Sequence, residues 1–596
     1  MGKFTSCLTF AAILLWPVNA RFHGANTTSG CKAVPGSDGW PSLEQWRALN
    51  QSIEGRLLQP DPPGAVCHPE HASYDATACP GIQASWFTEP LHSGDPVSSM
   101  WNNWNNDTCL PNPTLTCSSD GYPIYVVNAT TAEHVKAGVD FAREHNIRLI
   151  VKNSGHDYVG RSSAPNALSI WVHHMKEIKM HPDSFQPANC NITIEGHAIT
   201  AGAGTQMLEA YRVTAMQNRT VVGGNGRTVA LGGYITGGGH SILAPHYGMA
   251  ADQVLEMELV TPAGEIVTAN ECQNTDLFWA MRGGGGSTFG VLTSVTLKTI
   301  PSPEVTSFDF YFTTPSTNPH ALDAITYFIS KLPSLLDVGI SGYPLLFRSA
   351  PNQADGGQTL VSGMVGKLIT VHTDGDGSNR DTILEQVNPL FAHINSTWSD
   401  GGAFQFSTRT TAYASFGAWY EENYDPSAVG HSNVMGSRLL DRAALEANLT
   451  ATKAAFDGFS SGGGFATTAY IVSGPAVWEA QPRGGQGTAV HPAWRRTCVH
   501  ATASFNFPAL NATATALAID RAGAAAAALR ELSPDTGAYV NEANRYEPDW
   551  QQTFWGDNYE RLLRIKRAVD PDDVFWCQPC VGSERWEEVG DMLCRV

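Results

Sequence analysis

The chain has 596 residues, with 37 Lys and Arg against 56 Asp and Glu. This length predicts two or more domains around large cores. A composition of 42% hydrophobic and 16% charged residues excludes a long coiled coil and a mostly disordered chain. The net charge of −19, without any cluster of Lys and Arg, argues against a nucleic-acid partner.

Residues 1–20 have the pattern of a secretory signal peptide. Lys3 supplies the positive start, residues 8–15 supply a short apolar core, and small residues end the segment at Ala20. The apolar run is too short for a membrane span, which needs about 20 residues, and no later run is longer. The sequence therefore predicts a secreted, extracellular protein without a membrane span.

The cysteines and glycosylation sequons also fit a secreted, extracellular protein. Removal of Cys7 from a total of 12 cysteines leaves eleven, so at least one stays unpaired. Five of them lie before residue 118, which predicts a disulfide-rich N-terminal extension over residues 21–118. We expect ten cysteines to pair and one to remain a buried free thiol. N-glycans are predicted at Asn26, Asn50, Asn106, Asn128, Asn191, Asn218, Asn395, Asn448 and Asn511.

A regular pattern begins near residue 122. Residues 124–127 form a β-branched run, and Thr130 or Thr131 can cap a helix with apolar positions at one-turn spacing. A second apolar run over 147–152 completes a β-α-β unit that ends in the turn 153–157. Residues 190–300 are rich in strands and glycine, including a strand over 254–260 and a hairpin turn at 263–264.

Residues 303–535 change to an α+β pattern, which predicts a sheet covered by helices. The tail that follows carries one predicted helix, over 555–568. The expected strands are 307–312, 343–347 and 368–372, and the expected helices are 320–332, 382–394, 437–456 and 515–532.

The glycine clusters admit two interpretations, phosphate binding or tight turns and close strand crossings. No Gly-x-Gly-x-x-Gly fingerprint or Gly-Lys-Ser/Thr loop is present, so neither a dinucleotide fold nor a P-loop is indicated. The run at 151–162, Val-Lys-Asn-Ser-Gly-His-Asp-Tyr-Val-Gly-Arg-Ser, resembles the pyrophosphate loop of the vanillyl-alcohol-oxidase flavoprotein superfamily, in its berberine-bridge-enzyme-like branch. The resemblance implies FAD, joined covalently to His156; the alternative is a turn histidine with ordinary hydrogen bonds.

Further motifs follow in the family's order. Residues 228–241 resemble its glycine-rich flavin-contacting stretch, and 247–252, 276–286 and 289–291 complete the FAD domain. Residues 539–542, 555–559, 562–566 and 570–571 resemble the branch's C-terminal element. Beside His156, the resemblance implies cofactor contacts at Asn153, Ser154, Gly155, Asp157, Gly160, Gly226, Thr228, Gly232, Gly233, Gly237, Gly238, Gly239, Gly290, Val291 and Asn541.

The resemblance also implies the fold class. We expect an α+β protein with a two-subdomain, PCMH-type FAD-binding domain and a substrate domain whose antiparallel sheet is covered by helices. The expected boundaries are 119–301 for the FAD domain, 302–535 for the substrate domain and 536–596 for the C-terminal element. The substrate is expected between the flavin and the sheet.

Two departures from the family pattern affect the site. Some members carry a second flavin link from a Cys, but Gly226 and Arg227 stand there, so one covalent bond is implied. Glu542 closes a Tyr-Val-Asn-Glu run where several members have a second tyrosine. Glu542 is the candidate base, for which it needs reach to the substrate and ideally a pKa raised by burial. A surface or hinge carboxylate is the alternative, and Tyr539 is the competing catalytic candidate.

Three other patterns are assigned no chemistry. The C-x-x-C at 577–580 suits structural disulfides in a secreted chain better than redox activity or zinc. The Gly-x-Ser-x-Gly at 458–462 lacks the strand-turn-helix context of a hydrolase elbow. The histidines, including His173 and His174, show no metal-ligand spacing, so we expect no metal.

The function expected from the resemblance is that of a secreted fungal FAD-linked oxidase, similar to isoamyl-alcohol-oxidase-like proteins. Such an enzyme would oxidise an alcohol or a secondary metabolite by hydride transfer to flavin N5, with O2 as acceptor. Oxidative ring closure or desaturation of an alkaloid or polyketide, sugar oxidation, and a glycoprotein without catalysis remain the alternatives.

Overall fold

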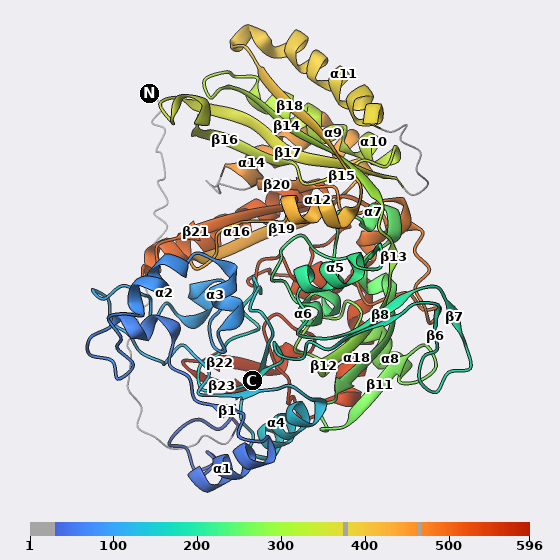
Figure 1. The fold of residues 1–596 in the computed structure, drawn as a ribbon. Coiled ribbons are helices and arrows are strands. Elements are labelled where there is room, and N and C mark those ends of the chain that lie inside the picture. Colours follow the sequence, from blue (N-terminus) through green and yellow to red (C-terminus); the bar gives the residue numbers. More distant parts are fainter. Residues whose placement is uncertain (1–29, 373–379, 462–466) are drawn as a thin grey trace, which may run out of the picture.

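The computed structural model describes residues 30–372, 380–461 and 467–596. Three main sheets divide the molecule into a lower part with two small sheets and an upper part with one large sheet (Figure 1). This arrangement confirms the predicted α+β class. The predicted signal peptide, the sequon at Asn26 and the end of the Gly-x-Ser-x-Gly run lie outside the described residues.

The first small sheet has the strand order β1-β2-β4-β3, with β2, β4 and β3 parallel. The Thr131 side chain caps α4 by accepting a hydrogen bond from the His134 amide. The apolar face of α4 then packs on the sheet together with α1. The elements are α1 (Leu43–Ser52), β1 (Leu57–Leu58), β2 (Tyr125–Asn128), α4 (Ala132–Glu144), β3 (Leu149–Lys152) and β4 (Leu168–Trp171).

The second small sheet is antiparallel, with the strand order β11-β10-β12-β8-β5. Two two-stranded ribbons, β6 with β7 and β9 with β13, accompany it. The elements of this part are β5 (Ile178–His181), β6 (Ser184–Phe185), β7 (Ile194–Glu195), β8 (Ala198–Gly202), α5 (Met207–Ala215), β9 (Arg219–Thr220), α6 (Leu231–Thr236), α7 (Ala244–Tyr247), β10 (Val254–Val260), β11 (Ile266–Asn270), α8 (Thr275–Ala280), β12 (Val291–Lys298) and β13 (Ile300–Pro301).

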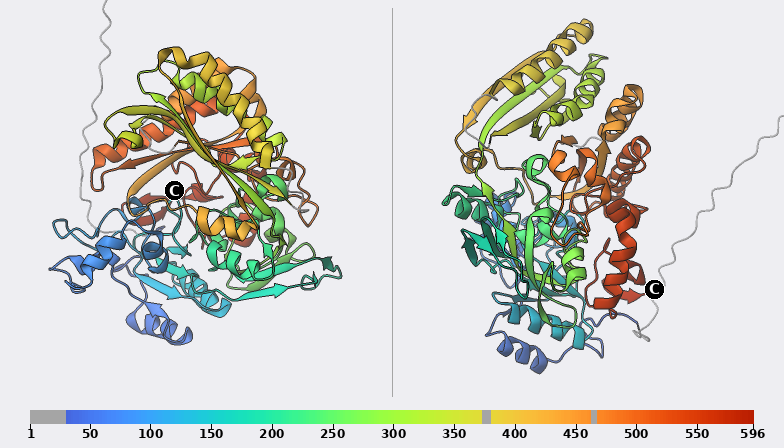
Figure 2. Two further views of the ribbon diagram at one scale, coloured as in Figure 1. Left: turned by 45° about the horizontal axis from the view of Figure 1, so that its top comes forward. Right: turned by 90° about the vertical axis from the view of Figure 1, so that its right-hand side faces the viewer.

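The large sheet is antiparallel, and its helices cover one face (Figure 2). Successive side chains of a strand point to opposite faces. Phe308, Phe310 and Phe312 of β14 therefore pack in the helix-covered core, whereas Asp309 and Tyr311 between them line the cavity below. The strands are β14 (Glu304–Pro315), β15 (Ser341–Gly342), β16 (Leu345–Pro351), β17 (Leu360–His372), β18 (Gln405–Tyr413), β19 (Ser432–Asp441), β20 (Thr467–Tyr470) and β21 (Thr497–Phe507).

The helices of this upper part differ from expectation at one place. The predicted helix over 437–456 is wrong for its first residues, which belong to β19, a strand that is buried along nearly its whole length and contacts β21 and α16; the rest of the range falls on α13 and α14. Asp441 then caps α13 by accepting from the Ala444 amide. The helices are α9 (Ala321–Ser330), α10 (Leu332–Asp337), α11 (Arg380–Trp398), α12 (Phe416–Asn423), α13 (Arg442–Glu446), α14 (Leu449–Ser460), α15 (Pro475–Trp478) and α16 (Ala512–Leu532).

The C-terminal segment returns to the lower part of the molecule. The expected helix over 555–568 is instead α17 (Trp550–Trp555), a short 3-10 turn and α18 (Tyr559–Val569), followed by β22 (Trp586–Val589) and β23 (Met592–Arg595). The ammonium group of Lys566 is buried and donates to Asp570 at 2.5 Å and to the Phe575 carbonyl at 2.7 Å. It also donates to the Thr288 carbonyl at 2.9 Å, so the ammonium group ties α18 to the segments that contain Thr288 and Phe575.

The N-terminal segment is more ordered than its composition suggests. It contributes β1 to the first sheet, and it includes α2 (Cys79–Ser85) and α3 (Glu89–Gly94), which lie beside the large sheet (Figure 1). All eleven described cysteines match the predicted pairing, with Cys498 as the buried free thiol. The disulfides are Cys31–Cys594, Cys67–Cys79, Cys109–Cys117, Cys190–Cys272 and Cys577–Cys580. Among the described helices, none combines the length and apolar character of a membrane span.

Candidate active site

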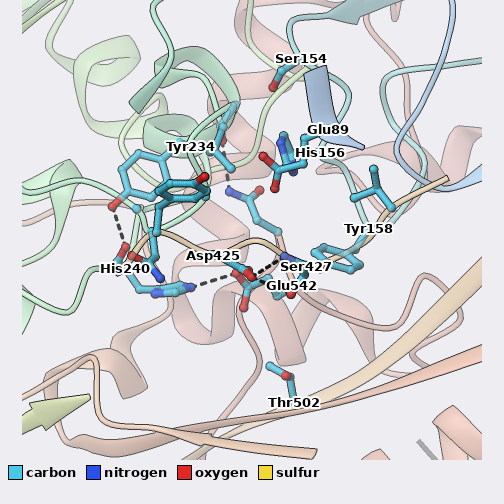
Figure 3. Close-up of a pocket in the computed structure, with 18 of the residues that line it drawn as sticks. Glu89, Ser154, His156, Tyr158, Tyr234, His240, Asp425, Ser427, Thr502 and Glu542 are labelled. Atoms are coloured by element: carbon cyan, nitrogen blue, oxygen red, sulfur yellow. Dashed lines mark hydrogen bonds and ion pairs between the residues drawn. The ribbon is translucent and has the colours of Figure 1, made fainter. Parts of the chain in front are cut away.

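A cavity of about 790 Å³ lies between the lower part of the molecule and the open face of the large sheet (Figure 3). The large sheet supplies one wall, and the turn after β3 and the glycine-rich segment before α6 supply the other. The wall includes most of the predicted site residues: Asn153, Ser154, Gly155, His156, Asp157, Gly226, Gly232, Gly233, Gly290, Val291, Tyr539, Asn541 and Glu542.

The turn that follows β3 has the properties of an anion cradle. Gly155 has a φ of +84°, a conformation that favours glycine. Within the described residues, the amides of Ser154, Gly155 and His156 donate no hydrogen bond, and the buried Oδ1 of Asn153 has no partner. Free backbone amides at a cavity wall suit a phosphate group. The residues present therefore fit the pyrophosphate of FAD.

His156 projects from this turn into the cavity (Figure 3). Its Nε2 lies 2.6 Å from the Oγ1 of Thr228, whereas Nδ1 contacts no hydrogen-bond partner among the described residues. Burial, with smaller contributions from Lys152 and His92, lowers the pKa of His156 to about 3. The imidazole is thus neutral and offers one free nitrogen to the cavity.

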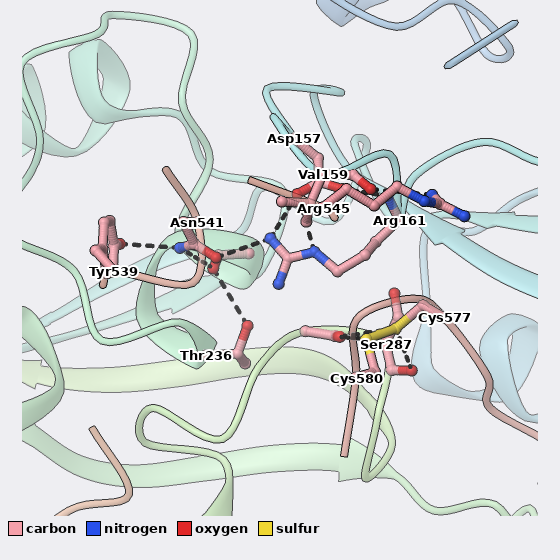
Figure 4. A network of polar contacts seen from close by, with 12 residues as sticks. Asp157, Val159, Arg161, Thr236, Ser287, Tyr539, Asn541, Arg545, Cys577 and Cys580 are labelled. Atoms are coloured by element: carbon pink, nitrogen blue, oxygen red, sulfur yellow. Dashed lines mark hydrogen bonds and ion pairs between the residues drawn. A yellow bond between two sulfur atoms is a disulfide. The ribbon is translucent and has the colours of Figure 1, made fainter. Parts of the chain in front are cut away.

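A polar network joins the turn to the C-terminal segment (Figure 4). Arg161 donates to the Asp157 carboxylate through Nε at 2.9 Å, and its Nη2 donates to Asn541 Oδ1 at 2.9 Å. Asn541 Nδ2 in turn donates to the Gly233 carbonyl at 3.1 Å. Arg161 Nη1 is buried and has no partner in the described part of the chain. The network fixes Asn541 and leaves one guanidinium N–H group for a bound anion.

Five predicted cofactor residues lie behind the cavity wall instead of on it: Gly160, Thr228, Gly237, Gly238 and Gly239. Thr228 supports His156, and the glycines make room for other side chains. A Cβ at Gly160 would lie 2.6 Å from the Trp104 ring, and one at Gly237 would lie 2.2 Å from Asn541 Nδ2. These glycines therefore permit close packing and make no contact with the cavity.

Glu542 lies between two histidines (Figure 3). Its Oε1 is 2.9 Å from His240 Nε2, and its Oε2 is 2.9 Å from His500 Nε2. Burial opposes ionisation of Glu542, but the two imidazoles outweigh it and hold the pKa below its usual range. The net pKa is therefore not raised, as the role of a base would favour, and the side chain is half-buried at the cavity rather than on the outer surface.

Tyr539 is buried and its hydroxyl is engaged. It accepts hydrogen bonds from the Gly239 amide at 3.2 Å and from Asn541 Nδ2 at 2.9 Å. Burial, with the nearby charge of Glu542, raises the pKa of this hydroxyl above its ordinary value. Tyr539 thus retains its proton and is suited to donating a hydrogen bond rather than to acting as a base.

The three groups at this end of the cavity also have the composition of a metal site. One ligand atom each from His240, His500 and Glu542 lies within 4.8 Å of the others, a spacing that a divalent cation could bridge. The two short hydrogen bonds of Glu542 account for the grouping by themselves.

Several residues at the site were not predicted from the sequence. His240 directly follows the Gly237–Gly239 run, so its place in the flavin-contacting motif was a usable signal. His500 lies within β21, and Glu89 begins α3 in the N-terminal segment, where no motif marks them. Aromatic side chains complete the wall, chiefly Trp101, Tyr158, Tyr343, Tyr424 and Tyr470.

Comparison with known proteins agrees with this geometry. A family model described as "FAD binding domain" matches residues 123–270, and one described as "Berberine and berberine like" matches residues 538–582. The chain is 34% identical to a bifunctional decalin synthase of Penicillium decumbens over 96% of both chains. It is 32% identical to the VAO-type flavoprotein oxidase VAO615 of Thermothelomyces thermophilus, also over 96% of both.

Solved structures share the fold. The VAO-type flavoprotein MtVAO713 of Myceliophthora thermophila C1 superposes with a TM-score of 0.86 at 28% identity, covering 95% of this chain and all of the other. A glucooligosaccharide oxidase of Acremonium strictum, described with a 6-S-cysteinyl, 8α-N1-histidyl FAD, has a TM-score of 0.60 at 17% identity, over 78% of this chain and 92% of its own. The chain therefore belongs to the fungal FAD-linked oxidoreductases of the VAO type with a berberine-bridge-like C-terminal element.

Proposed function

We propose that the protein is a secreted, glycosylated oxidase that carries FAD bound covalently through His156 and oxidises an alcohol group with O2 as acceptor. The observation that carries the proposal is the cavity, which has a neutral histidine with a free Nδ1 at one end and a histidine-carboxylate pair at the other. FAD would supply the hydride acceptor. The residues of this chain would position the substrate and move its proton.

His240 is the proposed catalytic base, and Glu542 is its orienting partner. With Nε2–H donating to the ionised Glu542, the imidazole of His240 carries its lone pair on Nδ1, which has no partner within the described residues. A carboxylate held against one imidazole nitrogen fixes the tautomer and stabilises the imidazolium that forms. The His240–Glu542 pair, which lines the cavity, would take up the proton of the substrate hydroxyl as the adjacent C–H bond breaks.

The cavity favours a substrate with aromatic or polycyclic character. Tyr343 and Tyr470 meet edge to face, with ring centroids 4.9 Å apart, and Trp101 stacks on Tyr158 at 4.7 Å. Such walls bind flat apolar molecules, while a few polar groups fix their orientation. The same walls support a second candidate function, oxidative ring closure or desaturation of a secondary metabolite, and the relative named a decalin synthase favours it.

Secretion and glycosylation are supported by the surface. The eight sequon asparagines in the described residues are exposed or half-buried, so their side chains are open to modification. Asn448 and Asn511 cap α14 and α16 through Oδ1, which a glycan on Nδ2 leaves free. Five disulfides also suit an oxidising compartment.

One panel of measurements tests the proposal. The protein is produced by a secreting fungal host and incubated with alcohols, sugars and polycyclic metabolites, and hydrogen peroxide and product mass are recorded. Peroxide with a product two mass units lighter supports oxidation, and a product with a new ring favours the second candidate. Absence of peroxide and of product with every class would contradict oxidase activity.

A further inference from the structure

A buried carboxyl group from the N-terminal segment reaches the flavin-attachment end of the cavity. Glu89 is the first residue of α3, outside both segments that match the FAD-related family models. Its side chain is only 8% exposed and lines the cavity near His156 (Figure 3). A buried carboxyl group is costly unless hydrogen bonds compensate. Its partners therefore indicate what it does.

Glu89 is linked to His156 through a single hydroxyl group. Thr228 Oγ1 donates to Glu89 Oε2 at 2.8 Å, and the same oxygen lies 2.6 Å from His156 Nε2. When Glu89 is ionised, the single hydroxyl proton of Thr228 is used toward Glu89, so Oγ1 accepts from Nε2–H of His156. The chain of bonds thus selects the tautomer in which Nδ1 carries the lone pair and faces the cavity.

The charged groups around Glu89 are few. Arg227 Nε lies 3.9 Å from Glu89 Oε2, and the more distant Asp425 repels its charge. Burial, opposed by the Thr228 hydrogen bond, raises the pKa of Glu89 to about 7. The group can therefore hold or release a proton near neutral pH, which an exposed glutamate does not.

We propose that Glu89 and Thr228 are positioning residues for the covalent attachment of FAD to His156. The inference rests on the proposed covalent link. Attachment forms a bond between Nδ1 and the 8α carbon of the flavin and breaks one C–H bond at that carbon. The electron pair of that C–H bond and its proton pass to the flavin ring, which becomes reduced. The Nε2 proton passes through Thr228 to Glu89, and O2 then reoxidises the flavin and yields hydrogen peroxide.

The arrangement also accounts for a carboxyl group at this position. A histidine alkylated on Nδ1 becomes cationic unless it loses its Nε2 proton, and a cation is costly in a buried site. Glu89 removes that proton through one hydroxyl group, so the attached imidazole ends neutral. Gly226 stands where some relatives of this fold carry the second flavin link. A Cβ at Gly226 would lie 4.0 Å from Glu89 Oε1, so Glu89 lies beside that position as well.

The experiment follows attachment separately from binding. Wild-type protein and the variants Glu89→Gln, Thr228→Ala and Thr228→Ser are produced under flavin limitation and incubated with FAD. Total bound flavin is measured before denaturation, and covalent flavin is measured after acid precipitation and by intact mass. The matched control is Glu70→Gln, because Glu70 belongs to the same segment but its side chain is 64% exposed.

The proposal predicts that Glu89→Gln and Thr228→Ala slow covalent attachment by about 10-fold or more, while non-covalent FAD binding persists. Thr228→Ser, which keeps the hydroxyl group, should restore attachment, and Glu70→Gln should match wild type. If Glu89→Gln attaches FAD at the wild-type rate, the role of Glu89 is overturned, but the covalent link at His156 is not. If Glu89→Gln and Thr228→Ala lose FAD binding, and Thr228→Ser does not restore it, the two residues have a structural role. That result also overturns the proposal. Wild-type protein that never holds covalent flavin overturns the His156 link itself.

Discussion

The two ends of the cavity pair a histidine with a glutamate in opposite ways. At one end, Glu89 reaches His156 only through the Thr228 hydroxyl, and its pKa is raised to about 7. At the other end, Glu542 accepts from His240 and His500 directly, and its pKa is held below the usual range. The same residue types thus give one carboxyl group that titrates near neutrality and one that stays ionised.

The difference between the two pKa values follows from the groups that interact with each carboxyl group. Loss of contact with water raises the pKa of both carboxyl groups. For Glu542, the charge interaction and hydrogen bond with His240, together with His500, outweigh that penalty, whereas the Thr228 hydroxyl group and Arg227 do not outweigh it for Glu89. The ionised end is suited to orienting a base through repeated turnovers. The titrating end is suited to accepting one proton in a single event, the attachment of the cofactor.

The largest effect is expected at the ionised end, from His240→Asn. Loss of the base should lower kcat by about 10²–10⁴-fold, while flavin remains attached through His156. Stopped-flow measurement of flavin reduction would isolate the affected step. His393→Asn is the control, since His393 lies on α11 of the upper part, beyond the cavity. Unchanged flavin reduction in His240→Asn would remove His240 from catalysis.

A smaller loss is expected from Glu542→Gln, which keeps the shape but removes the charge that orients His240. We expect kcat to fall by about 10–100-fold, because the tautomer and the imidazolium lose their support. The pH profile should also change, since the low pKa of Glu542 keeps the wild-type pair ionised down to acidic pH. Equal kcat and an identical pH profile in the variant would contradict the orienting role.

Packing behind the wall offers a third test, Gly237→Ala. The added Cβ would lie 2.2 Å from Asn541 Nδ2, whose side chain is held by Arg161 and Tyr539. We expect a loss of about 1–3 kcal/mol in the free energy of unfolding. Gly523→Ala in α16 is the matched control, because its Cβ would enter open space, and it should stabilise by about 0.5–1 kcal/mol. Equal stability of the two variants would contradict the close packing.

The smallest effect concerns stability at the titrating end. The folded protein holds the Glu89 proton up to a pH of about 7, whereas the unfolded chain releases it near its ordinary value of 4.5. The contribution of Glu89 to stability is thus complete below pH 4.5 and is lost as the pH rises through 7. Glu89→Gln avoids this loss, so it should raise Tm at pH 8 by about 2–4 °C relative to wild type.

Thermal unfolding of both proteins at pH 4, 6 and 8 measures this effect. The advantage of the variant should disappear toward pH 4, where both side chains are neutral. A Tm difference that does not change with pH would show that Glu89 does not titrate in this range. Together with slower flavin attachment, higher stability at pH 8 would separate a functional role of Glu89 from a structural one.

The sequence predicted much of this fold because periodicity and local motifs are informative over short distances. The β-α-β unit, the turn at 153–157 and the antiparallel sheet follow from such patterns. The strand β19 was missed because it is buried on both faces, so its sequence, Ser-Asn-Val-Met-Gly-Ser-Arg-Leu-Leu-Asp, does not alternate between apolar and polar residues as a half-exposed strand would. Cys498 was foreseen only as one unpaired thiol in an odd set, not by its position.

Site residues that lie within one continuous motif were predictable from the sequence. Site residues that come together from distant segments were not. His156 and Asn541 were found because each lies in a contiguous motif. Glu89 is 139 residues away from Thr228 along the chain, and His500 is 42 residues from Glu542, so no local pattern joins them. Glu542 lines the cavity, but the two histidine partners that hold its pKa low could not be known from the sequence.

The central claim is that His156 holds FAD covalently, and denaturation tests it most directly. Wild-type protein and His156→Ala are unfolded in acid, freed of small molecules, and examined by visible absorbance and intact mass. The account predicts that wild-type protein keeps its flavin absorbance and gains the mass of one FAD, while His156→Ala loses both. Flavin that washes away from the unfolded wild-type protein would contradict it.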